Sequence, residues 1–186
     1  MPLINWNSQE NVVMYPKIKT ERLLLRPLNL SDLESMHEYA SDKENTMYMY
    51  HLPREIEETA EFLSSVTKEW VKDTPSFYEL AIELDGIQIG SISVYLNDNR
   101  DSGDIGWILN KKYWHNGYAT EAAIAIKDFA LNILQVKRLT ANCDYRNIAS
   151  SRVMEKIGLN LESDNGIRVY PKKNEIAREL TYSLNV

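Results

Sequence analysis

The clearest chemical feature of the chain is a glycine-containing segment that leads into an amphipathic helix. Residues 104–122 read DIGWILNKKYWHNGYATEA, so that a predicted strand and a short turn lead to Gly117. A glycine here permits a positive φ and a close approach between backbone and ligand. The amides at a helix start have no intrahelical partners, and the helix dipole favours an anion there. The segment is therefore either a plain strand-to-helix turn or a phosphate-binding loop. The amides of such a loop would come from His115, Asn116, Gly117, Tyr118, Ala119 and Thr120.

The remaining reactive side chains indicate neither a metal site nor a cysteine nucleophile. His37, His51 and His115 have no metal-ligand spacing relative to a cysteine or a second histidine, so we expect no metal site. Cys143 alternates with polar neighbours in a predicted strand. This pattern is typical of a small buried apolar residue, and we weigh a nucleophilic role as the lesser alternative.

Length and composition indicate a single folded domain. The chain has 186 residues, of which 44% are hydrophobic and 26% charged, and this balance argues against disorder. We expect one domain over residues 1–186, with residues 1–19 as an irregular N-terminal arm. The net charge of −6 argues against a nucleic-acid partner. With one cysteine, no apolar run near the ~20 residues of a membrane span and no secretory signal pattern, we expect a cytoplasmic protein without membrane contact.

Local patterns predict the elements that position the glycine segment. Ser31 and Glu34 have the spacing of a capping box, and Asp85-Gly86 has the composition of a two-residue hairpin turn. The predicted helices cover residues 31–40, 59–70, 117–134 and 147–158. The predicted strands cover residues 21–28, 77–84, 88–96, 104–109, 139–144, 167–170 and 178–184. This order predicts an α/β (α+β) fold around one mixed sheet.

The glycine segment resembles the pyrophosphate loop of the GNAT acetyltransferase superfamily, Q/R-x-x-G-x-G/A. Residues 114–122 read WHNGYATEA, with Trp114 at the position of Gln/Arg. Tryptophan is common there in the branch that acetylates the N-terminal alanine or serine of ribosomal proteins. Three further blocks resemble that branch: TERLLLRP at 20–27, DIGWIL at 104–109, and residues 147–159, where Leu159 replaces the usual phenylalanine. The resemblance covers residues 18–184, in the family's order.

The resemblance implies a fold and a cofactor. The fold would be a GNAT-type, mostly antiparallel sheet of about seven strands flanked by about four helices, splayed between the fourth and fifth strands. The acyl donor would be acetyl-CoA, with no metal, and its pyrophosphate would lie on the glycine loop. Backbone groups of Ile108 and Leu109 would pair with the pantetheine amides, as in strand addition. Asn147 would contact the pantetheine, cap its own helix, or do both.

Acetyl transfer to an amine requires a neutral amine and a thiolate that can leave. An α-amine with a pKa near 7.8 is about 14% neutral at pH 7, so a weak base suffices for it. By resemblance, Ser150 would face the sulfur and assist its departure; alternatively, it is a serine of the first helical turn that bonds the backbone. Asp104, beside the splay, and Glu79, on the neighbouring hairpin, are the candidate bases, and both can equally be solvated strand carboxylates.

These observations leave the acceptor open. By resemblance, we expect an N-acetyltransferase whose acceptor is a primary amine, foremost a protein N-terminal α-amine, by direct transfer in a ternary complex. A small amine, such as a polyamine, amino acid or antibiotic, is the alternative, and so is a non-catalytic acyl-CoA-binding module. Tyr48 and Tyr50 would form a substrate lid or a plug over the core. We expect a monomer or a homodimer.

Overall fold

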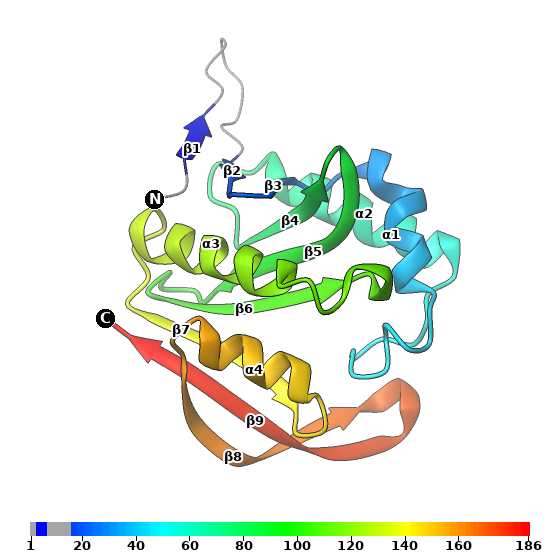
Figure 1. Ribbon diagram of the computed structural model, residues 1–186, viewed down its shortest axis with the longest axis vertical. Coiled ribbons are helices and arrows are strands. Elements are labelled where there is room, and N and C mark those ends of the chain that lie inside the picture. The colour runs from blue at the N-terminus through cyan, green and yellow to red at the C-terminus, as the bar shows by residue number, and fades with distance from the viewer. Residues whose placement is uncertain (1–2, 7–15) are drawn as a thin grey trace.

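One large sheet organises the molecule. The computed structural model describes residues 3–6 and 16–186, in which nine strands form a single sheet (Figure 1). The strands are β1 (Leu3–Trp6), β2 (Pro16–Lys19), β3 (Leu23–Pro27), β4 (Phe77–Leu84), β5 (Ile87–Leu96), β6 (Ser102–Leu109), β7 (Arg138–Asp144), β8 (Asn160–Tyr170) and β9 (Glu175–Asn185). Their order is β1-β2-β3-β4-β5-β6-β7-β9-β8. Every neighbouring pair is antiparallel except β6 and β7, so the mixed, mostly antiparallel sheet is confirmed.

Helices pack on both faces of this sheet (Figure 1). The described α-helices are α1 (Leu33–Ala40), α2 (Ile56–Trp70), α3 (Tyr118–Asn132) and α4 (Ile148–Lys156). Phe129 of α3 packs edge-on against Tyr78, which pairs with Val94. Tyr39 of α1 instead bonds Ser91 of β5. Ser91 and Val94 are three residues apart on one strand, so their side chains point to opposite faces of the sheet. The helices α1 and α3 therefore lie on opposite faces. No helix among the described residues is long and apolar enough to cross a bilayer.

The sheet splits between its two parallel strands. β6 and β7 pair at only three positions, the last of them Asp104 with Thr140. Beyond that point β6 remains paired with β5 as far as Leu109, and β7 remains paired with β9 as far as Asp144. The two strands therefore diverge and leave a gap in the hydrogen-bond ladder, which we call the fork. The expected splay between the fourth and fifth strands of the predicted sheet is confirmed at this place.

The helix after the glycine loop is held close to the sheet by small residues. Ala122, Ala123 and Ala130 of α3 are fully buried, together with Ile126 and Phe129. Alanine side chains let a helix approach its neighbours closely, while the larger residues fill the space between helix and strands. The start of α3 is thereby fixed relative to β5 and β6, which line the fork.

Three local predictions need correction. Residues 3–6 and 16–19, expected to be irregular, form β1 and β2, and residues 1–2 and 7–15 of the expected arm lie outside the described residues. Asn29 and Asp32, not Ser31 and Glu34, form the capping box, and they enclose a short 3₁₀ turn before α1. The strand expected at 167–170 begins at Asn160, because β9 pairs with it from Asn160 to Tyr170, with two irregularities in the register.

Candidate active site

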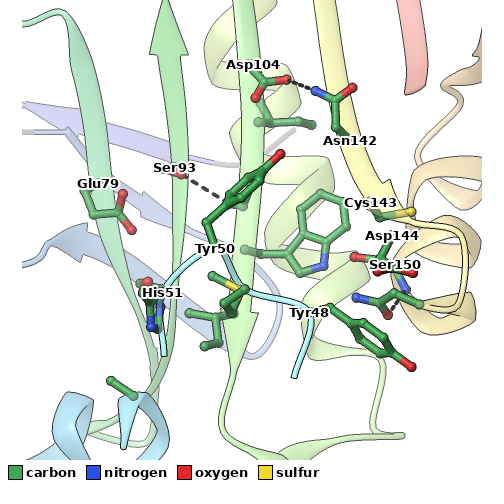
Figure 2. Close-up of a pocket in the computed structure, with 18 of the residues that line it drawn as sticks. Tyr48, Tyr50, His51, Glu79, Ser93, Asp104, Asn142, Cys143, Asp144 and Ser150 are labelled. Carbon is green, nitrogen blue, oxygen red and sulfur yellow. Dashed lines mark hydrogen bonds between the residues drawn. The ribbon is translucent and has the colours of Figure 1, made fainter. Parts of the chain in front are cut away.

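A cavity of about 350 Å³ lies at the fork. β4 and β5 contribute Glu79, Ser91, Ser93 and Tyr95, the diverging strands contribute residues 104–108 and 142–144, and α4 contributes Asn147, Ser150 and Met154. The segment of residues 41–54, which we call the lid loop, crosses the opening. Figure 2 shows Tyr50 and His51 of this loop in front of the strands that line the cavity, and Tyr48 on the side of Asp144 and Ser150. The fold therefore brings the candidate bases and Ser150 to one enclosed space.

The register of β6 decides which backbone groups face the fork. The N–H of Asn110 donates to the carbonyl of Ile89 on β5 at 2.8 Å. In an antiparallel pair such bonds recur at every second residue, so the backbone groups of Ile108 also point to β5. The N–H of Ile105 takes part in the last β6–β7 pairing, so the carbonyl of Ile105 and both backbone groups of Trp107 point to the open fork. The expectation that Ile108 offers free backbone groups is therefore wrong, and Trp107 holds that position.

Leu109 faces the fork, but its carbonyl is already occupied. The carbonyl oxygen accepts a hydrogen bond from Asn45 Nδ2 at 2.7 Å and another from Trp114 Nε1 at 2.7 Å. A carbonyl has two lone pairs, so no further strong acceptor capacity remains. Only the N–H of Leu109 is left for a ligand, which halves the predicted contribution of this residue.

The glycine loop has the geometry of an anion site. Gly117 precedes α3 with a φ of +81°, as expected of a residue that must be glycine. No acceptor in the described ranges takes the backbone N–H groups of residues 115–120; the first helical bond runs from Glu121 N–H to the Gly117 carbonyl. Arg22 holds the loop from outside, bonding the Asn116 carbonyl at 3.0 Å and Glu121 at 2.7 Å. The predicted amide set is therefore free and fixed in place.

Glu79 is a buried carboxyl, and no cation of the described residues lies within bonding distance of it. Only 6% of the residue is exposed, and Tyr95 Oη donates to its Oε2 at 3.3 Å. Burial raises the pKa of Glu79 to about 7, although hydrogen bonds from Ser91, Tyr95 and Ser93 oppose the rise. A carboxyl with a pKa near neutrality can accept and return a proton at physiological pH. The structure thus separates Glu79 from an ordinary solvated strand carboxylate.

Asp104 lies where the fork begins. Its Oδ1 accepts hydrogen bonds from Thr140 Oγ1 at 2.8 Å and from Asn142 Nδ2 at 3.0 Å, the second of which is drawn in Figure 2. Desolvation raises the pKa of Asp104, and the Thr140 bond opposes this rise. The two bonds connect β6 to β7 at the last paired position. Asp104 therefore stabilises the base of the fork, and it also faces the cavity.

The first turn of α4 presents Ser150 to the cavity. Asn147 Oδ1 accepts a hydrogen bond from Ser150 N–H at 3.1 Å. Asn147 therefore caps its own helix, which is one of the two roles expected for it. The capping bond uses the backbone of Ser150, and no hydrogen bond from its hydroxyl joins it to a described residue. Both residues line the cavity. The serine hydroxyl is available to a ligand.

The lid loop is fastened to the β8–β9 hairpin. Arg168 is buried and bonds Glu179 at 2.7 Å, Tyr50 Oη at 2.9 Å and the Tyr48 carbonyl at 3.2 Å. Lys173 Nζ donates to three further carbonyls of the loop, at 2.8 to 3.0 Å. These contacts hold the loop over the cavity mouth rather than in the core, which favours the lid over the plug.

The environments of Cys143 and His51 do not activate these side chains. Cys143 is buried, and desolvation raises the pKa of its thiol to about 11, which disfavours a thiolate nucleophile. Burial lowers the pKa of His51, so this ring is neutral at physiological pH. Within the described residues no cluster of three His, Cys, Asp or Glu side chains could hold a metal ion.

Two residues of the site have no signal in the local sequence. Asn45 bridges the lid loop to the end of β6, accepting from Lys111 N–H at 3.1 Å as well as bonding Leu109. Arg54, at the end of the lid loop, lines the cavity with its guanidinium 4.4 Å from the Phe62 ring centroid. The Asn45 contacts join residues 64 and 66 positions apart, the place of Arg54 depends on the cavity around it, and neither residue belongs to a recognisable motif.

Comparison with known proteins places this geometry in a family. The model of the acetyltransferase (GNAT) domain matches residues 22–160. The uncharacterized N-acetyltransferase YnaD of Bacillus subtilis (strain 168) is 32% identical over 169 residues, which span 90% of this chain and 95% of YnaD. The chain therefore belongs to the GNAT acetyltransferases, and it is an N-acetyltransferase of that family.

Solved structures agree with this assignment. A GNAT-family acetyltransferase from Bacillus anthracis is 33% identical, with a TM-score of 0.80 over 91% of this chain and 98% of its own. RimL, a ribosomal L7/L12 alpha-N-protein acetyltransferase solved with coenzyme A, is 16% identical, with a TM-score of 0.78 over 90% of this chain and 96% of its own. The second likeness shows a shared fold alone.

Proposed function

We propose that the protein transfers an acetyl group from acetyl-CoA to a primary amine. The observation that carries this proposal is the cavity at the fork, where the buried carboxyl of Glu79, with a pKa of about 7, shares one space with the Ser150 hydroxyl. A non-catalytic acyl-CoA-binding module has no need of a buried carboxyl that titrates near neutrality. The enclosed carboxyl therefore favours an enzyme.

The residues present fit acetyl-CoA. The free amides of residues 115–120 suit a pyrophosphate, and the fork suits an extended amide chain, which can use the carbonyl of Ile105 and the backbone groups of Trp107. When bound, acetyl-CoA supplies a thioester, whose carbonyl carbon is open to attack by an amine. The family and a structural neighbour solved with acetyl-CoA and AMP, the microcin C7 self-immunity acetyltransferase MccE, support this choice.

Glu79 and Ser150 handle the protons in this proposal. Glu79 takes the proton that the acceptor ammonium must lose before the nitrogen can attack, directly or through one water. Its burial keeps its proton affinity close to that of an α-amine, so the transfer is nearly balanced at pH 7. The Ser150 hydroxyl donates a hydrogen bond where negative charge develops on the leaving sulfur. Asp104 is the second candidate for the base.

Two acceptor classes fit this chemistry. A protein N-terminal α-amine is the first, supported by the fold shared with RimL, which is described as an alpha-N-protein acetyltransferase. A small-molecule amine is the second, and the fastened lid loop favours it. Arg168 and Lys173 hold that loop across the cavity mouth, so a compact acceptor enters more easily than a polypeptide.

One screen tests the function. The purified protein is given acetyl-CoA and a panel of peptides, polyamines, amino acids and aminoglycosides, and the release of free thiol is followed. Amine-dependent thiol release that Glu79→Gln reduces by about 10²–10⁴-fold supports the proposal. Tight acetyl-CoA binding without turnover of any amine indicates the non-catalytic module instead.

A further inference from the structure

Arg54 is a cation in the cavity, and no anion of the described residues pairs with it. No hydrogen bond or ion pair joins its guanidinium to a residue in the part of the chain that the structure describes, and its Nη1 is shut off from solvent. Its backbone is fixed, because the Arg54 N–H donates to the Ala40 carbonyl at 2.9 Å. The guanidinium is thus held in place with its donors unused.

Two other enclosed arginines, Arg168 and Arg26, have carboxylate partners. Arg168 has Glu179 at 2.7 Å, and Arg26 has Asp32 at 2.7 Å and Glu83 at 2.6 Å. Withdrawing a cation from water is unfavourable unless an anion or acceptors replace the water. Burial accordingly lowers the pKa of Arg54, against the attraction of Glu79 and other groups. A partner supplied by a ligand would remove this cost.

The charges of the cavity specify the form of that ligand. Asp144 is neutralised by Arg146, and Glu179 by Arg168. The groups left over are the cation of Arg54 and the carboxyls of Glu79 and Asp104. A polyamine would leave the guanidinium without a partner, and a phosphate dianion would be repelled by the two carboxyls. A molecule with one carboxylate and one ammonium matches both the Arg54 cation and the carboxyls.

We propose that the acceptor is a small amino acid-type amine whose carboxylate binds Arg54 while its amine faces Glu79. This inference rests on the proposed function and narrows its acceptor class. The planar guanidinium group can bind a carboxylate through two parallel hydrogen bonds. The cavity, at about 350 Å³, is within the range of small-molecule sites. Arg54 is then a specificity residue, which selects the acceptor without handling the reacting atoms.

The experiment compares amino acids with their primary amides, which keep the shape and lose the charge. Methionine, phenylalanine, alanine and glutamate are each paired with the amide of the α-carboxyl, and kcat/KM is measured with saturating acetyl-CoA. The variants are Arg54→Gln, Arg54→Lys and, as the control, Arg138→Gln, which removes a half-exposed arginine outside the cavity. Because Arg54 makes no hydrogen bond or ion pair with a described residue, we expect its replacement not to lower the melting temperature.

We expect the parent to favour at least one amino acid over its amide by ~10- to 100-fold, the usual range for a charged hydrogen-bond pair. Arg54→Gln should remove that preference by lowering only the amino acid rate, and Arg54→Lys should restore part of it. A preference for the amides, or for peptides, overturns the inference and leaves the acetyltransferase intact. An equal loss on acids and amides also overturns it, because Arg54 then acts through Glu79 or the fold.

Binding separates failure of the inference from failure of the proposed function. If no amine is acetylated, the proposed function fails, and thermal shifts are measured with the N-acetyl forms of the same four amino acids and of their amides. A shift with an acetylated amino acid that Arg54→Gln loses and Arg138→Gln keeps still supports the carboxylate site. Equal shifts with acids and amides, or no shift with either, overturn it.

Discussion

Replacing Glu79 with glutamine should make the protein more stable at alkaline pH. Burial raises the pKa of this carboxyl from an ordinary 4.5 to about 7. Between these two values the folded state binds more protons than the unfolded state, so the free energy of unfolding falls as pH rises. The full effect is about 3 kcal/mol, at 1.36 kcal/mol for each tenfold change in proton affinity. This loss in the free energy of unfolding is negligible below pH 4.5 and complete above pH 7.

Urea denaturation at pH 5.0 and pH 8.0, without ligand, measures this effect. Glu79→Gln removes the titrating group but retains a hydrogen-bonding side chain of similar size. The gain in stability over the parent should be about 2.5 kcal/mol larger at pH 8.0 than at pH 5.0. Glu61→Gln, on the exposed side of α2, is the matched control and should behave alike at both pH values.

The result also bears on the proposed chemistry. If the gain from Glu79→Gln is the same at both pH values, burial does not hold this carboxyl protonated, and its assignment as a base poised near neutrality is refuted. If the gain appears as expected, the same titration should govern the enzyme. The kcat/KM of the parent should then rise tenfold per pH unit below about pH 7 and level off above it.

Three further predictions follow from the loop, α4 and the lid. Gly117→Val, at a φ of +81°, should abolish the stabilisation by acetyl-CoA, about 2.7 kcal/mol at one hundred times Kd; an unchanged thermal shift refutes the phosphate loop. Ser150→Ala should lower kcat more than acetyl-CoA affinity, with a smaller defect on a thioester of a more acidic thiol; equal defects on both thioesters exclude assistance to the leaving group. Arg168→Gln should cost roughly 3 kcal/mol in urea unfolding by stranding Glu179, and it should raise the acceptor KM by loosening the lid loop; an unchanged KM would show that the loop does not gate acceptor binding.

Much of the fold was accessible from sequence because its signals are local. Asp85 and Gly86 both have the positive φ that a two-residue hairpin turn demands, and Gly117 begins α3 as expected. β2 was missed because four residues carry little pattern, and it is defined by pairing with β1 and β3. The start of β8 was missed because it, too, is defined by pairing with another strand, β9. A strand that depends on a distant partner leaves a weak trace in its own residues.

The site was predictable as far as its motifs reach. Ser150 and the two candidate carboxyls line one cavity, and the glycine loop begins α3 with free amides. The exchange of Ile108 for Trp107 was not predictable, because the register with β5 decides which way a backbone group points. Arg54 was not predictable either, since its significance lies in a partner that is missing from the fold. Sequence reveals residues that are present, whereas unfilled bonding capacity is visible only in three dimensions.

The fork also determines how the amides of β6 should exchange with deuterated water. On this strand, Gly106 and Ile108 direct their N–H groups to β5, while Trp107 and Leu109 direct theirs to the open side. In the free protein, slow and fast exchange should therefore alternate from one residue to the next along a single strand. An extended amide ligand in the fork would slow the fast set and leave the slow set unchanged. Labelling resolved to single amides would thus record occupancy of the fork without any acetyl transfer.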